Sequence, residues 1–304
     1  MRRKIAYGKI SQTVAFLLLI TLLLLSQQEK LFGFAATRLR FSATLYLIND
    51  PKIALNVGNY YFNGGAYNLT FAKRAYQRAL KLDPEISLAH YQLSRIHFLR
   101  GNFYDALREI NQELVLHPEI PNSYYVRGLI QGYQGSFSSA AEDFNKFIEL
   151  VPGQWAGYND LAWILARLGK FKEMKEVSER AFKTIPGIEV KNPWLWISLG
   201  IAHLNLREYN NARQAFSKAL ALAEKMSPQR FWSAYPGNHP AEAERAYRQF
   251  LGSIHLNLGL ASEKLGAVQE AKTSYKRALS WFNQAGSPER MELEEKIKKL
   301  EELK

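Results

Sequence analysis

The sequence predicts an all-α solenoid in which about six helical hairpins stack in a row, chiefly because residues recur every 34 positions. Three residue types keep this spacing from Asp83 onward. They are the prolines Pro84, Pro118, Pro152 and Pro186, the glycines Gly101, Gly135 and Gly169, and the phenylalanines Phe103, Phe137 and Phe171. Each unit reads as two amphipathic helices joined at the glycine and ended by the proline. One hairpin cannot bury its own apolar face, so neighbouring hairpins must stack.

The composition agrees with an ordered body and excludes several kinds of site. The chain has 304 residues, of which 47% are hydrophobic and 22% are charged, and it contains no cysteine. These fractions are close to the globular average and argue against a disordered, collagen-like or many-span membrane protein. The lack of cysteine excludes disulfides, thiolate zinc sites, iron–sulfur ligation and a cysteine nucleophile. Packing alone must therefore stabilise the fold.

Residues 1–28 are predicted to form an N-terminal membrane anchor or signal segment. The apolar run Val14–Leu25 is interrupted only by Thr21. That run alone would span about 18 Å as a helix, short of a hydrocarbon core of about 30 Å, but a helix counted from Ile5 is long enough if Lys9 reaches the headgroups. Charged residues follow the run, which favours an uncleaved anchor over a cleaved signal or a buried soluble helix.

The flanking charges predict the orientation of this segment. Four basic residues precede the apolar run and three follow it, namely Arg2, Arg3, Lys4 and Lys9 before, and Lys30, Arg38 and Arg40 after. Positive charge is retained in the cytoplasm, so the N-terminus is expected there. The body of the protein is then expected on the periplasmic or extracytoplasmic side of a single-pass membrane protein.

Residues 29–52 are expected to be a juxtamembrane linker or an N-terminal capping helix. In the capping interpretation, Leu39, Ala43, Tyr46 and Leu47 pack on the first repeat. The alternative is an interfacial helix that lies on lipid.

Residues 53–286 are assigned to the repeat array, with one insertion. The six units lie near 51–84, 87–118, 121–152, 155–186, 193–226 and 252–285. The insertion, residues 227–240, carries three prolines and three aromatic residues. Residues 287–304 begin with Ser-Pro-Glu, which is typical of a helix start, and continue with alternating charges around Met291, Leu293, Ile297 and Leu300. They are predicted to form a C-terminal capping helix.

At further positions the units resemble the tetratricopeptide repeat family, in which a first helix (helix A) carries Leu, Gly and Tyr, and a second (helix B) carries Ala, an aromatic residue, Ala and Pro. The matching residues are Gly58, Tyr61, Ala72, Tyr76 and Ala79 in the first unit, Leu93, Ser94 and Ala106 in the second, Tyr124, Gly128, Ala140 and Phe144 in the third, Tyr158, Leu161, Ala162 and Ala181 in the fourth, Trp196, Leu199, Gly200, Ala212, Phe216 and Ala219 in the fifth, and Leu258, Gly259, Gly266, Ala271, Tyr275 and Ala278 in the sixth. The second unit departs from the pattern at Glu113, where the family has a small residue. The resemblance implies a right-handed superhelical solenoid and specifies no ligand.

The resemblance also implies a binding surface. In this family the concave groove is lined by the second, fifth, ninth and twelfth positions of helix A. These positions give the candidate partner-binding residues Tyr91, Arg95, Phe98, Asn122, Tyr125, Asn159, Trp163 and Trp194, together with Leu88, Leu129, Ile197 and Ile201. The family's carboxylate clamp needs Lys or Arg with Asn on successive helices A, but Leu55, Asn59, Gln92, Asn122 and Val126 occupy those positions here. An extended or helical peptide held by aromatic anchors is therefore the expected ligand.

The insertion is a second candidate contact. Phe231, Trp232 and Tyr235 lie in a proline-rich loop and are predicted to touch a partner or a membrane. A loop that covers the end of the groove would have the same composition.

No residue pattern predicts catalysis, a cofactor or a metal. Four of the six histidines, His90, His97, His203 and His255, occupy large-residue positions of helix A, where packing explains them. The chain lacks the nucleotide-binding, nucleophile-elbow and zinc-protease motifs, and the repeats leave no room for a separate catalytic domain. The protein is expected not to be an enzyme.

The net charge of +12 raises nucleic acid as an alternative partner. Residues 1–50 carry +5 of this charge at the membrane end, and the rest is dispersed without a basic stripe at the period of the repeat. The sequence therefore predicts a non-catalytic protein-interaction scaffold or assembly factor tethered to a membrane. The alternatives are an RNA-binding helical-repeat protein and a cleaved, secreted or periplasmic assembly factor, and self-association is left open.

Overall fold

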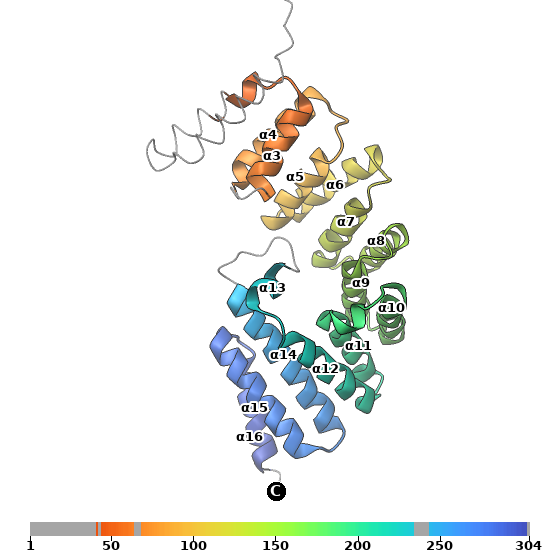
Figure 1. The fold of residues 1–304 in the computed structure, drawn as a ribbon, viewed down its shortest axis with the longest axis vertical. Coiled ribbons are helices and arrows are strands. Elements are labelled where there is room, and N and C mark those ends of the chain that lie inside the picture. Colours follow the sequence, from red (N-terminus) through yellow and green to blue (C-terminus); the bar gives the residue numbers. More distant parts are fainter. Residues whose placement is uncertain (1–40, 42–43, 64–67, 234–242, 303–304) are drawn as a thin grey trace, which may run out of the picture. The chain divides into compact units, whose positions relative to one another are not determined.

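The computed structural model describes Phe41 and residues 44–63, 68–233 and 243–302, and this described part contains helices and turns but no strand (Figure 1). It divides into two compact units, Met1–Ile130 and Gln131–Lys304, which we call unit 1 and unit 2. The predicted anchor at residues 1–28 lies outside the described residues. Among the residues described, no helix is both long enough and apolar enough to cross a bilayer.

Unit 1 contains two complete hairpins and most of a further helix A. The first hairpin pairs α3 (Pro51–Asn63) with α4 (Leu69–Leu82), and the second pairs α5 (Ala89–Leu99) with α6 (Phe103–Leu116). Most of α7 (Pro121–Tyr133) follows. Helix α4 buries the small and aromatic residues Ala72, Ala75, Tyr76 and Ala79, whereas α6 buries Ala106, Ile110, Glu113 and Leu114. The prediction of an all-α array of tetratricopeptide-type hairpins is thus confirmed in this unit.

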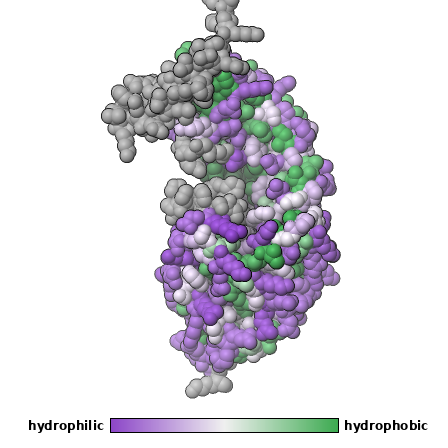
Figure 2. All heavy atoms as spheres, viewed as in Figure 1, coloured by the Kyte–Doolittle hydropathy of each residue, from purple (hydrophilic) through white to green (hydrophobic). Residues whose placement is uncertain are grey.

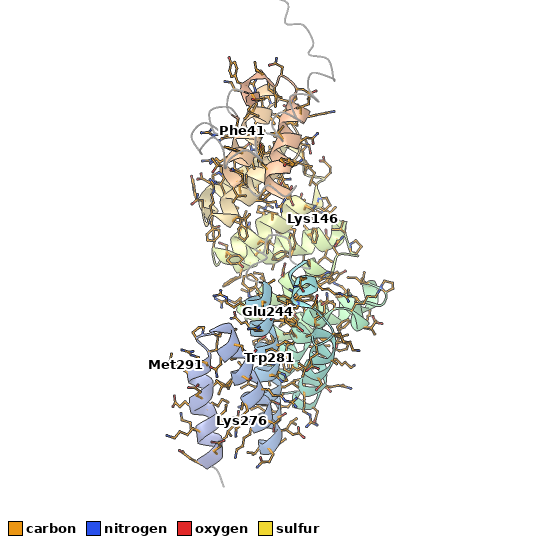
Figure 3. All side chains as sticks on the ribbon, turned by 60° about the vertical axis from the view of Figure 1, so that its left-hand side comes forward. Phe41, Lys146, Glu244, Lys276, Trp281 and Met291 are labelled. Carbon is orange, nitrogen blue, oxygen red and sulfur yellow. The ribbon has the colours of Figure 1, made fainter. Side chains whose placement is uncertain are left out.

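Unit 2 continues the array and ends in a single helix (Figure 1). Its helices are α8 (Phe137–Leu150), α9 (Trp155–Arg167), α10 (Phe171–Thr184), α11 (Pro193–Asn205), α12 (Tyr209–Ala223), α13 (Pro228–Ser233), α14 (Ala243–Lys264), α15 (Val268–Ala285) and α16 (Arg290–Glu302), with a 3-10 turn at Ile188–Val190. Helix α16 packs on α15 through Leu293, Ile297 and Leu300, while Met291 points outward (Figure 3). The rest of the surface of unit 2 seen in Figure 2 is predominantly hydrophilic.

Five of the turns that the structure describes inside hairpins have a left-handed backbone. Gly101, Gly135, Gly169 and Gly266 have φ of 72°, 82°, 70° and 75°. Glycine adopts this conformation without the steric penalty of a Cβ atom, which explains the glycine ladder in the sequence. In the hairpin of α11 and α12 the same turn position is Arg207, with φ of 63°. This turn therefore carries backbone strain that the glycine turns avoid.

The segment before α3 caps the first hairpin, although not with the expected side chains. Phe41 stacks on Phe71 at 4.2 Å between ring centres, and Leu45 and Ile48 are buried in the same cluster. The prediction that Tyr46 and Leu47 pack inward is wrong, because the helical turn directs both to the surface. Leu39 and Ala43 lie outside the described residues. The Arg78 guanidinium fixes the segment by donating to the carbonyl oxygens of Tyr46 and Ile48.

The hydrogen bonds of Glu113 explain why this position departs from the small residue of the family pattern. Its side chain is 0% exposed, and its carboxylate accepts hydrogen bonds from the backbone N–H groups of Leu88 at 2.6 Å and Tyr91 at 3.0 Å. These two groups begin α5, where Leu88 has a left-handed φ of 72° and supplies no side-chain cap. A carboxylate at a helix N-terminus satisfies unpaired donors and interacts favourably with the helix dipole. Glu113 of α6 is thus the N-terminal cap of α5.

The described part of the insertion is helical, whereas a loop was predicted. Residues 228–233 form α13, and α14 begins at Ala243, well before the sixth unit expected at 252–285. Tyr247 of this added first part of α14 donates a hydrogen bond to the carbonyl oxygens of Ala223 and Met226. The insertion therefore adds a packed layer to unit 2.

Candidate functional site

Arg95 of α5 lies in the middle of the candidate binding surface of unit 1, which is formed by the helices A of its repeats. The Arg95 guanidinium lies 4.6 Å from the centre of the Phe62 ring and 5.6 Å from that of the Tyr91 ring. One of its nitrogens donates to Gln92 Oε1 at 2.9 Å. Among the residues that the structure describes, no carboxylate lies within ion-pair distance of this half-buried cation. Two aromatic rings and an amide thus position a guanidinium whose charge has no counter-ion on the surface described.

An amide network extends this arrangement to the first hairpin. Asn59 Oδ1 accepts hydrogen bonds from the Tyr76 hydroxyl at 2.9 Å and from Gln92 Nε2 at 3.1 Å. Burial raises the pKa of Tyr76 above its usual value, and the nearby charge of Arg95 opposes that rise. Tyr76 is therefore a neutral donor, and the network from Tyr76 through Asn59 and Gln92 to Arg95 is rigidly connected.

The other predicted residues of unit 1 differ in exposure. Phe98 packs with Tyr91 on the cluster formed by Ala106, Ile110, Val126 and Ile130, and its ring centre is 5.8 Å from that of Phe103. Asn122 is exposed at the first turn of α7, and Tyr125 is half-buried on the same helix. Phe62 was missed by the sequence prediction, although it occupies the same register position in the first unit as Phe98 in the second. The register alone could have identified it.

In unit 2, Asn159 and Trp163 of α9 lie in different settings. Asn159 Nδ2 donates to Asp160 Oδ1 at 3.1 Å, and its Oδ1 accepts from Ser198 Oγ at 3.4 Å. Trp163 is 39% exposed, with its ring centre 5.9 Å from that of Tyr133. A Cβ atom at Gly132 would lie 2.8 Å from this ring, so the indole lies against bare backbone. Trp163 and Tyr133 together form an exposed aromatic pair.

Trp194 and Phe231 do not lie on an open surface. Trp194 stacks on Trp155 at 5.3 Å, on Phe231 at 5.7 Å and on Phe250 at 5.4 Å between ring centres. Phe231 is only 8% exposed and also packs on Tyr247 and Phe250. The prediction of Phe231 as an exposed contact is wrong, because α13 turns it into the apolar core of unit 2. Tyr235 lies outside the described residues, and the structure places only the backbone of Trp232, in α13.

The four helix A histidines lie in packed settings. His90 Nδ1 is 2.7 Å from Glu109 Oε2, and His203 pairs with Glu208. Burial lowers the pKa of His97, helped by Lys73, and burial near Arg277 lowers the pKa of His255 to about 4. Within the described ranges, no three His, Asp or Glu side chains are arranged to hold a metal ion.

Comparisons with known proteins agree with this architecture. Two models of the tetratricopeptide repeat match the chain, one at residues 69–123 and 125–173 and the other at 195–226 and 252–284. A curated relative, outer dynein arm-docking complex subunit 4 of Danio rerio, is 28% identical over 117 residues. That match covers 38% of this chain and 24% of the relative, so the chain spans only about a quarter of the relative's length.

Solved structures share the fold at low sequence identity. PilW, described as a widely conserved type IV pilus biogenesis factor, superposes with a TM-score of 0.61 at 16% identity, over 80% of this chain and 97% of PilW. YrrB, described as a tetratricopeptide protein with an unusual peptide-binding site, superposes with a TM-score of 0.50 at 14% identity, over 69% of this chain and 93% of YrrB. These likenesses show the fold alone.

Proposed function

Since the chain belongs to the tetratricopeptide repeat family, whose members are protein-interaction scaffolds, we propose that it is a non-catalytic scaffold that binds a partner peptide on the helix A face of unit 1. The family assignment supports protein binding in general. YrrB, a structural neighbour, has a peptide-binding site. The partner class proposed here comes from the chemistry of the Arg95 site.

The observation that carries the proposal is the charge of Arg95, which no described carboxylate pairs. A half-buried guanidinium without a carboxylate partner gains from a ligand anion, and the two rings and Gln92 already fix its position. Tyr91 and Phe98, both half-buried, offer apolar contact next to it, while the buried Phe62 supports the guanidinium from below. We therefore expect an acidic peptide segment with an apolar or aromatic anchor.

The membrane is the second part of the proposal. The N-terminal apolar segment is proposed to hold the protein at a membrane, with the repeats on the periplasmic or extracytoplasmic side. Such a tether raises the local concentration of partners at that surface without any chemistry. The charge balance around the apolar run supports this orientation.

The peptide part is tested by panning a random peptide library on the full chain reconstituted in nanodiscs. We expect peptides enriched in Asp or Glu next to an apolar residue. Their affinity should fall at least about tenfold in Arg95→Gln, because a charge-assisted hydrogen bond is lost. The matched control is Arg108→Gln, which removes an exposed arginine of α6 that pairs with Asp105 and should leave the affinity unchanged.

Equal binding of the selected peptides to Arg95→Gln and to the unchanged protein would refute the Arg95 site. The tether is tested separately by alkaline carbonate extraction of membranes from cells that express the full chain. Retention in the membrane pellet is expected, and release into the supernatant would contradict the anchor while leaving the peptide result intact.

A further inference from the structure

A cation, an imidazole and a carboxylate meet where the first repeat contacts the second. Lys73 of α4 donates from Nζ to His97 Nε2 of α5 at 3.2 Å. The other ring nitrogen of His97, Nδ1, faces Asp105 Oδ2 of α6 at 3.7 Å. The buried imidazole thus fills the space between a cation of the preceding helix B and a carboxylate of its own repeat.

A related group occurs in unit 2 between the fourth and fifth repeats. His203 Nδ1 pairs with the Glu208 carboxylate, and the same carboxylate accepts from Lys175 Nζ at 2.9 Å. Here, too, a histidine of helix A fills the interface beside a lysine of the preceding helix B.

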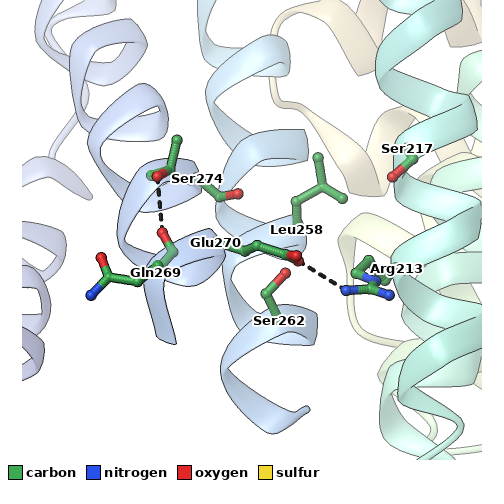
Figure 4. A pocket seen from close by; sticks show the side chains of 8 residues that line it. Arg213, Ser217, Leu258, Ser262, Gln269, Glu270 and Ser274 are labelled. Atoms are coloured by element: carbon green, nitrogen blue, oxygen red, sulfur yellow. Dashed lines mark hydrogen bonds and ion pairs between the residues drawn. The ribbon is translucent and has the colours of Figure 1, made fainter. Parts of the chain in front are cut away.

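The next interface in unit 2 has the cation and the carboxylate but no histidine. Arg213 of α12 pairs with Glu270 of α15 at 2.9 Å, and Ser262 of α14 lies on the helix between them (Figure 4). Next to these residues the structure has a cavity of about 400 Å³, lined also by Ser217, Leu258 and Gln269. We call it the Ser262 pocket.

The repeat register aligns the cation and the histidine position of the three interfaces, and it aligns the carboxylates of the first and the last, whereas Glu208 stands earlier in its repeat. Lys73, Lys175 and Arg213 each directly follow a buried residue of helix B, namely Ala72, Met174 and Ala212. His97, His203 and Ser262 each stand three residues after a small residue of helix A, namely Ser94, Gly200 and Gly259. Asp105 and Glu270 directly precede the buried Ala106 and Ala271. Ser262 therefore occupies the register position of the histidine in the other two interfaces, and this smaller side chain, only 2% exposed, lines the Ser262 pocket.

We propose that the Ser262 pocket binds an imidazole group, supplied by a histidine side chain of a partner segment. A neutral imidazole accepts one hydrogen bond and donates another, so it can accept from the Arg213 guanidinium and donate to the Glu270 carboxylate. His97 in unit 1 has the same kinds of neighbour, with a hydrogen bond at Nε2 from Lys73 and with Nδ1 3.7 Å from the Asp105 carboxylate. The cavity exceeds the size of one ring, which leaves room for the backbone that carries the histidine.

Binding of an imidazole requires the Arg213–Glu270 ion pair to separate, and this separation costs little free energy. The side chains of Arg213 and Glu270 are 39% and 61% exposed. Exposed pairs of this kind contribute little to stability, so their separation by a ligand is easily offset by two charge-assisted hydrogen bonds. This site uses helices of unit 2 and does not rest on the peptide site of unit 1.

Saturation-transfer NMR of the full chain in nanodiscs at pH 8 tests the proposal, because imidazole is then mostly neutral. The probes are imidazole, 1-methylimidazole, which cannot donate, and Nα-acetyl-histidine N-methylamide. We expect saturation of imidazole and of the histidine amide, with at least about tenfold weaker binding of 1-methylimidazole. Binding of free imidazole without the histidine amide would overturn the assignment to a protein side chain.

Variants make the site assignment specific. Ser262→His should fill the pocket and abolish saturation, and Glu270→Gln, which keeps the pocket, should weaken imidazole binding at least about tenfold. The reciprocal change His97→Ser is the positive control, since it opens the equivalent space in unit 1 and should add imidazole binding. If His97→Ser gains binding while the unchanged protein shows none, or if binding persists in Ser262→His, the proposal is overturned.

Discussion

Helices α5 and α11 occupy the same place in their repeats, but the side chains at their groove positions differ in chemistry and in burial. At the four positions that line the groove in this family, α5 has Leu88, Tyr91, Arg95 and Phe98, and α11 has Trp194, Ile197, Ile201 and Leu204. The α5 positions hold a half-buried cation between rings. The α11 positions pack on the apolar cluster that contains Phe231 and Tyr247.

The difference shows that register alone does not decide whether a groove position binds a ligand. In unit 2 the insertion supplies α13 and a longer α14, and their aromatic residues cover Trp194. In unit 1 no described segment pairs the charge of Arg95. The two helices can therefore be compared by substitutions that should act mainly on stability in unit 2 and mainly on binding in unit 1.

The largest effect is expected for Phe231→Ala. Removing a buried ring that contacts Trp194, Tyr247 and Phe250 should lower the free energy of unfolding by about 4 kcal/mol. All six tryptophans lie in unit 2, so urea unfolding followed by tryptophan fluorescence reports this unit. The control is Tyr104→Ala in unit 1, where the side chain is 79% exposed, and it should leave the urea midpoint of the fluorescence transition unchanged. A wild-type midpoint for Phe231→Ala would show that the ring is not part of the core.

A smaller effect is expected from pH, through His255 of unit 2. Its folded-state pKa is about 4 against a usual 6.5, so the unfolded chain takes up the proton first as the pH falls. The contribution of His255 to the free energy of unfolding is therefore constant above about pH 6.5, and it falls by about 3 kcal/mol as the pH approaches 4. His97 of unit 1, whose pKa is also lowered, adds to the loss.

The contribution of His255 is measured by urea titrations between pH 7 and pH 4 with tryptophan fluorescence. His255→Gln, which cannot take up a proton, should flatten the pH dependence of unit 2. A slope as steep as that of the unchanged protein would assign the effect to other groups.

Arg207→Gly is expected to stabilise unit 2 by about 1 kcal/mol. Glycine removes the steric penalty of a left-handed backbone at this turn. Part of this gain is offset because glycine also increases the conformational entropy of the unfolded chain. The matched change in unit 1, Gly101→Arg, should destabilise its hairpin, and circular dichroism with urea measures both. Destabilisation by Arg207→Gly would mean that the arginine side chain stabilises the turn by other contacts.

The smallest effect on stability is expected for Arg95→Gln, below about 1 kcal/mol, because a half-exposed guanidinium loses one hydrogen bond to an amide oxygen and two ring contacts. Thermal unfolding by circular dichroism measures it. A loss as large as that of Phe231→Ala would identify Arg95 as a structural residue of α5 and would remove the contrast between the two helices.

The sequence was sufficient for the elements that repeat. Glycines with a positive φ at four turns, prolines after four of the helices B and buried alanines on helix B recur because these hairpins share a turn geometry and an internal contact. Prediction from the period therefore located the helices of the repeats within each unit. It also placed Tyr91, Arg95 and Phe98 on one helix, where they share a surface through contacts with Phe62 and the unit 1 core.

The elements that do not repeat could not be predicted in this way. The insertion has no partner repeat to indicate which side of Phe231 is buried, and its aromatic residues suit a contact surface and a core equally well. Tyr46 and Leu47 were assigned to the wrong side of a short helix, because few residues define its apolar face. The Ser262 pocket depends on a small residue at one position and a cation on another helix, so it emerges only when the helices are packed.

The cap that Glu113 provides for α5 has a consequence for synthesis on the ribosome. The first turn of α5 is complete only when a residue of α6, more than twenty positions later in the chain, has left the exit tunnel. Until then two amide donors depend on water, and α5 has no side-chain cap of its own. The start of α5 is therefore capped only after α6 has followed it out of the tunnel, and α5 frays at its start until then.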